Sequence, residues 1–178
     1  RVFELSTEDF GNINPNTKTA PVFRTQKDAD LTAKVYSRLP IIHNEGLKQN
    51  LWDLNFTRQF DMTNDSNLFH LERGNNKFIP LYESKFIWFY NHRNSTFEGS
   101  NKRTSTTNVS LAHSKNPNYK IQPWYWIDRK KVEETTKEKY YLGFRNIARN
   151  TDARTAIFSL VPFSGVGNSM PLISIKRI

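Results

Sequence analysis

Alternating apolar and polar residues predict strands along much of the chain. Between residues 51 and 60, large apolar side chains are separated by Asp, Asn, Thr and Gln, as in a half-buried strand. Residues 78–90 are more continuously apolar and predict a strand that bends or bulges near Glu83 and Ser84. Further strands are expected at residues 119–127, 141–148, 154–161 and 172–175.

Helical patterns are fewer. One helix is expected over residues 27–39, with Thr25 as its cap, and it ends there because Pro40 cannot continue it. A second helix is expected from Asp128 to about Tyr140, with a Lys- and Glu-rich interior that faces water. The chain therefore has more strand than helix.

Three stretches carry turn or loop signals. Residues 1–23 are polar and are expected to form an extended lead-in. Pro162, Gly165 and Gly167 indicate a turn region before the last strand. Residues 94–118 are rich in Ser, Thr and Asn and nearly free of apolar residues, which predicts a long mobile loop.

The order of these elements indicates the fold class. The strands and helices do not alternate as β-α-β units, so we expect an α+β fold with a mainly antiparallel or mixed sheet, a few flanking helices and a long basic loop. A chain of 178 residues is most simply one domain, here residues 24–178 after the lead-in.

Positive charge is concentrated in one part of the chain. The net charge is +9, and residues 85–131 supply +7 of it, because nine Lys and Arg stand against Glu98 and Asp128 alone. Aromatic residues lie in the same stretch, at Trp88, Tyr90 and residues 124–126. Cations neutralise phosphates and aromatic rings stack on bases, so a DNA partner is favoured over an incidentally basic surface.

A second basic cluster surrounds Asp152. Arg145, Arg149 and Arg154 are suited to contact phosphate or guanine, or else to form a salt-bridge network that fixes a hairpin. For Arg154 with Asp152 the network is the favoured interpretation. The full set of candidate DNA-binding residues is Lys85, Trp88, Tyr90, His92, Arg93, Lys102, Arg103, Arg145, Arg149 and Arg154.

The chain lacks the residues that several classes of functional site require. With no cysteine, disulfides and thiolate zinc sites are excluded, and the four His are too far apart to suggest a metal site. No glycine-rich cofactor loop and no Gly-x-Ser-x-Gly elbow occurs, so we expect no cofactor in this chain. No apolar run reaches the roughly 18 residues of a membrane span, and we expect a cytoplasmic protein.

Two alternatives to a DNA-binding function stay open. Asp65, Glu83 and Lys85 fit the loose spacing of magnesium-dependent nucleases, in which two carboxylates hold the metal and the Lys assists water. On a strand, residues 83 and 85 would point to the same face, as that chemistry requires. The other alternative is a protein-interaction or scaffold domain with an incidentally basic face.

A series of short motifs adds a family resemblance. In order, the chain contains Ala20-Pro21-Val22-Phe23-Arg24-Thr25, Asp28-Ala29-Asp30-Leu31-Thr32, Phe60-Asp61-Met62-Thr63-Asn64-Asp65-Ser66, Pro80-Leu81-Tyr82-Glu83-Ser84-Lys85, Asn91-His92-Arg93, Gly143-Phe144-Arg145-Asn146-Ile147, Thr151-Asp152-Ala153-Arg154-Thr155 and Gly167-Asn168-Ser169-Met170-Pro171-Leu172. This series resembles the C-terminal part of large restriction-modification and phage-defence adenine DNA methyltransferases, of the type IIG-like, type ISP-like and DISARM kinds.

The resemblance implies a role and a context. The chain would be a non-catalytic target recognition region that binds double-stranded DNA, part of a larger protein whose upstream methyltransferase domain uses S-adenosylmethionine. The catalytic Asn/Asp-Pro-Pro-Tyr/Phe tetrapeptide of that domain is absent here. Lys85, His92, Arg93 and Arg154 fall on matching motifs, while Ser84 and Asn91 depart from a frequent Gly and Asp.

Overall fold

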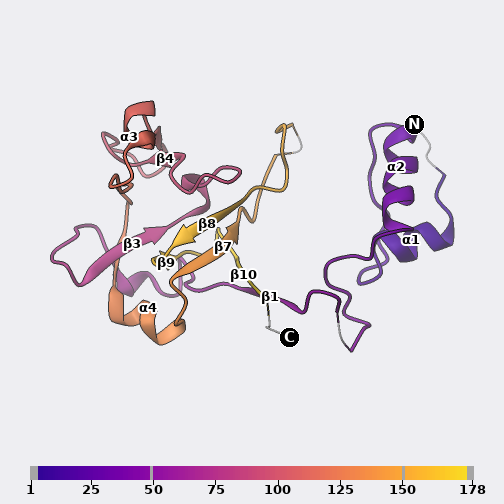
Figure 1. Ribbon diagram of the computed structural model, residues 1–178, viewed down its shortest axis with the longest axis horizontal. Coiled ribbons are helices and arrows are strands. Elements are labelled where there is room, and N and C mark those ends of the chain that lie inside the picture. The colour runs from indigo at the N-terminus through magenta and orange to yellow at the C-terminus, as the bar shows by residue number, and fades with distance from the viewer. Residues whose placement is uncertain (1–3, 49, 150, 176–178) are drawn as a thin grey trace. The chain divides into compact units, whose positions relative to one another are not determined.

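The computed structural model describes residues 4–48, 50–149 and 151–175 and has an α+β fold (Figure 1). The chain divides into two compact units, residues 1–55 together with 175–178, and residues 56–174. The division falls inside strand β1 (Leu54–Thr57), whereas the sequence suggested a boundary after residue 23.

The first unit contains two helices that contact each other, α1 (Thr7–Ile13) and α2 (Gln26–Tyr36). Each begins with a reciprocal capping box, formed by Ser6 with Asp9 and by Thr25 with Asp28. Residues 7–13 are therefore helical, and the extended lead-in predicted for residues 1–23 is wrong over this segment. The Ser6 box makes a helix start there, although the segment has few large apolar residues.

The second unit is built mainly from three sheets. One has the strand order β1-β10-β7-β8, formed by Leu54–Thr57, Leu172–Ile175, Tyr140–Phe144 and Phe158–Pro162. Another has the order β2-β6-β3-β9, formed by Phe69–His70, Trp126–Asp128, Phe78–Tyr82 and Gly165–Val166. The smallest pairs β4 (Ser95–Thr96) with β5 (Thr107–Asn108). Short helices complete the unit: η1 (Ser66–Leu68), η2 (Ser84–Phe86), α3 (Leu111–Lys115) and α4 (Arg129–Thr135).

Strand β3 divides the hydrophobic core into two clusters. Ile79 and Leu81 belong to a cluster with Ile127 and Val132, while Tyr82 belongs to a cluster of ten buried residues. This follows from the two-residue period of a strand, which sends Leu81 and Tyr82 to opposite faces. The sheet around β3 is mixed, because β6 pairs with it antiparallel and β9 pairs parallel.

Several predicted elements are shorter than their patterns suggested. The strand expected over residues 78–90 ends at Tyr82 and is followed by η2. Only Trp126–Asp128 of the stretch from residue 119 is a strand, and the helix after Asp128 ends at Thr135. For the two strands, pairing with a neighbour, which the local pattern does not reveal, decides how far the strand extends.

Two loop predictions also need correction. Residues 94–118 contain β4, β5 and α3, so this stretch is a short hairpin and a helix, not one long loop. Gly165 lies in the buried strand β9 (Gly165–Val166) and not in a turn. A Cβ atom at this position would stand 2.5 Å from Ile127 Cγ2 and 3.0 Å from Leu81 Cδ1. The residue is glycine because the neighbouring side chains leave no room for a Cβ.

Candidate nucleic-acid interface

Three consecutive aromatic residues, Trp88, Phe89 and Tyr90, form a feature that we call the aromatic tip. The chain turns tightly here, because Trp88 N donates to Asn91 O at 2.7 Å and Asn91 N donates to Trp88 O at 3.0 Å. Tyr90 has a φ of +59° and is 82% exposed. The aromatic stripe expected at the end of a strand is thus the tip of a turn.

The aromatic tip is fixed against the end of the β7–β8 hairpin. Tyr90 N donates to Phe158 O at 2.9 Å. Arg145 donates to Ile87 O from Nε at 3.1 Å and from Nη2 at 2.7 Å. Since Phe144 and Phe158 are the last pair of that hairpin, the loop of residues 145–157 begins and ends beside the tip.

Two cations of that loop lie over rings of the tip. The Arg145 guanidinium is 5.0 Å from the centre of the Trp88 ring, and the Arg154 guanidinium is 4.3 Å from the Phe89 ring. Both distances are those of cation–π contacts. Burial lowers the pKa of Arg145, which nevertheless stays charged at neutral pH.

Asp152 has a different partner from the one favoured by the sequence. Arg149 Nη2 lies 3.3 Å from Asp152 Oδ1, and Arg149 N donates to Asp152 Oδ2 at 3.3 Å. Arg154 instead lies over Phe89. The salt bridge therefore joins residues three apart in one turn and leaves the Arg154 side chain exposed beside the tip.

A buried carboxylate organises a second group of cations. Glu83 is 5% exposed, and its Oε2 lies 3.5 Å from both Lys85 Nζ and Arg103 Nη2. Lys85 Nζ also donates to Arg103 O at 3.1 Å. A buried carboxylate requires such partners, because its desolvation is otherwise uncompensated. The pairs remove part of the charge that Lys85 and Arg103 would offer to a phosphate.

The same two cations contact aromatic rings. Lys85 Nζ is 5.1 Å from the Phe97 ring centre, and the Arg103 guanidinium is 5.0 Å from the Tyr125 ring centre. Phe97 is itself buried against Phe86. Both cations are thus held at the edge of the core by a carboxylate and by rings.

The carboxylates of the nuclease alternative have other partners. Asp65 Oδ2 accepts from Asp61 N at 2.8 Å, within its own turn. Glu83 follows the end of β3 and Lys85 lies in η2, so the shared strand face expected for them is not formed. Within residues 4–48, 50–149 and 151–175, no group of three or more His, Asp or Glu is placed to hold a metal ion.

Arg93 is a positioning residue. Its Nη1 donates to Asn116 O at 2.8 Å and Tyr119 O at 3.0 Å, and its Nη2 donates to Ser114 O at 3.1 Å. Three carbonyl groups around the end of α3 are thereby satisfied by one guanidinium. Arg93 orders residues 114–119, so most of its donors are already used.

His92 is partly buried, and its environment disfavours the cation. Burial, with a smaller contribution from the charge of Arg93, lowers the pKa of His92. Its Nδ1 is buried without a hydrogen-bond partner in the described part of the chain. His92 is therefore neutral at pH 7 and is a weaker candidate for a phosphate contact than the sequence suggested.

Lys102 is exposed, and its ammonium group makes no hydrogen bond or ion pair to the residues that the structure describes. With Arg154, it is the most available cation of the predicted set. Trp88, Tyr90, Arg145 and Arg154 thus lie together at the aromatic tip, and Lys85 and Arg103 lie together around Glu83, while the structure does not bring the other four predicted residues into either group. Phe89, Phe97, Tyr125 and Glu83 were missed as members of these groups, although the aromatic run itself pointed to Phe89.

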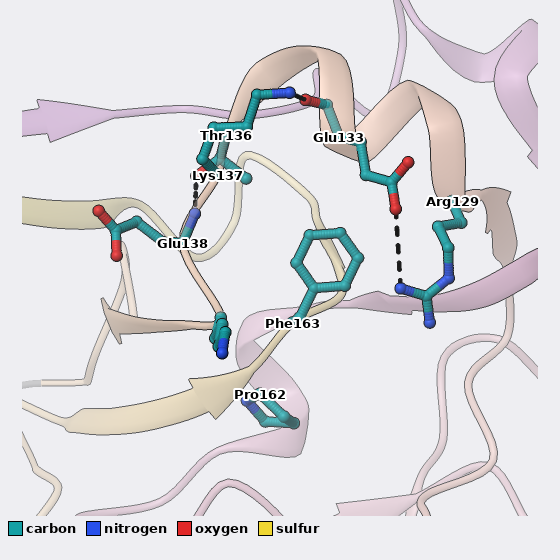
Figure 2. Close-up of a pocket in the computed structure, with 8 residues that line it drawn as sticks. Arg129, Glu133, Thr136, Lys137, Glu138, Pro162 and Phe163 are labelled. Carbon is teal, nitrogen blue, oxygen red and sulfur yellow. Dashed lines mark hydrogen bonds and ion pairs between the residues drawn. The ribbon is translucent and has the colours of Figure 1, made fainter.

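A pocket of about 630 Å³ lies elsewhere and contains none of the ten predicted residues (Figure 2). Its lining mixes charges of both signs with Phe163, whose ring lies 5.2 Å from the Arg129 guanidinium. Arg129 also pairs with Glu133 at 3.8 Å. Because the lining contains both Lys or Arg and Glu, the pocket does not present charge of a single sign. The lining residues are Arg129, Glu133, Thr136, Lys137, Glu138, Lys139, Pro162 and Phe163.

Comparison with known proteins adds no relative: no protein-family model, no curated protein and no solved structure matches this chain. The link to methyltransferases therefore depends on the motif series alone. No helix among the described residues is long and apolar enough to span a membrane.

Proposed function

We propose that this chain is a non-catalytic, DNA-binding target recognition region of a restriction-modification or phage-defence adenine DNA methyltransferase. Its ligand is double-stranded DNA. The upstream domain of the same protein would bind S-adenosylmethionine and carry out methyl transfer, and with a DNA partner the protein would act in the cytoplasm.

One observation carries the DNA-binding proposal: two cations lie over rings of the exposed aromatic tip, and two more lie over rings beside Glu83. They are Lys85 with Phe97, Arg103 with Tyr125, Arg145 with Trp88 and Arg154 with Phe89. Nucleic-acid binding uses this combination, since cations contact phosphates and rings contact bases or sugars.

A salt titration tests the proposal. The affinity of the full chain for a random-sequence duplex is measured from about 50 to 200 mM salt, where counterion release dominates binding. We expect the affinity to fall steeply with salt. Lys102→Ala/Arg154→Ala should weaken binding and lower the slope of log K against log salt by up to about 2, roughly one unit for each phosphate that is no longer neutralised.

The control removes two charges outside the candidate interface. Lys27→Ala/Lys34→Ala lies on α2, where Ala is a good helix former, and should leave the slope near that of the native chain. Equal slopes for both double variants would mean that net charge alone attracts DNA. An absence of DNA binding at low salt would end the proposal and favour the scaffold alternative.

The methyltransferase context has a separate test. The full-length protein should contain an adenine methyltransferase domain with an Asn/Asp-Pro-Pro-Tyr/Phe tetrapeptide upstream of residue 1. If no such domain is present, the DNA-binding proposal can still hold, but its assignment to this family of enzymes is wrong.

A further inference from the structure

Tyr90 is held in an unfavourable arrangement that packing does not explain. Its φ of +59° lies in the left-handed region, which side chains with a Cβ atom rarely adopt. Its ring is 82% exposed and contacts the ring of Phe89, with centroids 4.2 Å apart. A large aromatic side chain is thus kept in water in a backbone conformation that glycine or asparagine would adopt more readily.

The base of the aromatic tip is well anchored. Trp88 and Phe89 are half-buried beneath Arg145 and Arg154, and the backbone of Tyr90 is bonded to Phe158. The Tyr90 ring therefore projects from a fixed support. Strained residues that the surrounding structure holds in place are concentrated at ligand-binding sites.

The chemistry around the ring indicates its ligand. Arg145 and Arg154 stand beside the tip and are suited to phosphates, while the free face of a tyrosine ring is suited to a nucleobase. Bases in an intact duplex are already stacked on one another. A projecting ring therefore finds a free base face only where a base has been separated from its neighbour or its pairing partner.

We propose that Tyr90 stacks on an unpaired or unstacked base, so that the aromatic tip prefers DNA with a local opening. The ligand class is duplex DNA that contains one such base, with flanking phosphates bound by the arginines. This inference deepens the proposed function and depends on it. The aromatic tip thereby differs from the Glu83 group, in which Phe97 is buried and Tyr125 is partly buried, whereas the Tyr90 ring is exposed.

The test compares two duplexes that differ at one position. Each carries 2-aminopurine, paired with thymine in one duplex and facing an abasic site in the other. We expect the full chain to bind the opened duplex more tightly by roughly 5- to 150-fold, the range that removal of one base–aromatic stack costs. Stacking should also quench the 2-aminopurine fluorescence.

Three variants separate stacking from folding. Tyr90→Gly removes the ring and accommodates the positive φ, so it should keep its thermal stability but lose the preference for the opened duplex. Tyr90→Phe should keep the preference. Tyr140→Ala removes another exposed tyrosine ring, 65% exposed on β7, and should leave the preference for the opened duplex unchanged.

The outcomes are distinct. Equal affinity for both duplexes, or a preference that survives Tyr90→Gly, overturns the stacking inference while DNA binding stands. Loss of the preference in Tyr140→Ala as well would also overturn it, because the effect would then not belong to the tip. If neither duplex is bound at low salt, both this inference and the proposed function are wrong.

Discussion

The two units of this protein form their secondary structure by different means. Residues 56–174 enclose two clusters of buried apolar side chains, with Leu81, Phe86 and Ile127 among the fully buried members. In residues 4–48 and 50–55, Ala29 is the single buried apolar residue. Large apolar side chains of this part stay exposed, namely Val22, Leu31, Val35, Leu39, Ile42, Leu47, Leu51 and Trp52.

The comparison shows what local signals can do without a core. Helices of 7 and 11 residues are marginal by themselves in water, so α1 and α2 depend on their capping boxes and on each other. The larger unit depends on burial. All ten predicted DNA-binding residues lie in the larger unit, where a packed core can fix their geometry.

The largest difference between the units should appear when a core ring is removed. Phe86 is fully buried between Tyr82 and Phe97, so Phe86→Ala should lower the free energy of unfolding by about 3–5 kcal/mol. Leu31→Ala, at a side chain 59% exposed on α2, should change it by less than about 0.5 kcal/mol. Urea denaturation followed by circular dichroism measures both, and a large cost at Leu31 would mean that α2 has a covered face.

Glycine substitutions should have opposite signs in the two units. Gly165→Ala places a methyl group against Ile127 and Leu81 and should destabilise the protein by about 1–3 kcal/mol. Gly11→Ala lies in α1 with no atom within 4 Å, so it should stabilise that helix by up to about 1 kcal/mol. Thermal unfolding compares the two, and a neutral Gly165→Ala would contradict the close packing of β9.

Cap removal should loosen the smaller unit alone. Thr25→Ala deletes the side-chain oxygen that accepts from Asp28 N, at a cost of about 1 kcal/mol. Amide hydrogen exchange of α2 should then accelerate, while exchange in β7 and β8 stays unchanged. Thr32→Ala, inside the same helix, keeps the cap and should not accelerate exchange, because Ala is the better helix former.

Acid should act on the larger unit through His92. Because its pKa is lowered in the folded protein, the unfolded chain binds a proton first as the pH falls below about 6.5. The stabilising effect of a neutral His92 is complete above that pH and is lost between about 6.5 and the lowered pKa. Unfolding at pH 7.5 and 5.5 should show a smaller loss of stability in His92→Gln than in the native chain, whereas His70→Gln, at an exposed position, should retain the full loss.

Much of the fold class was predictable from local pattern. The apolar periods correctly indicated an α+β chain, the strand at Leu172–Ile175, and a helix capped by Thr25. The candidate site was predictable only as a composition, a basic segment with aromatic residues. Which of its residues are available to a ligand and which bind the protein's own backbone was not predictable. Arg93 and Arg145, for example, donate to backbone carbonyls of segments distant in sequence.

The sequence by itself determined the helix caps and the charge distribution, since these depend on residues within a few positions of one another. Tertiary structure decided the rest. It ended β3 at Tyr82, buried Gly165 against Ile127, paired Glu83 with Arg103 and positioned Arg154 over Phe89. Each of these features is a contact between two segments distant in sequence. The free energy of such a contact depends on both segments, so neither segment's local pattern predicts it.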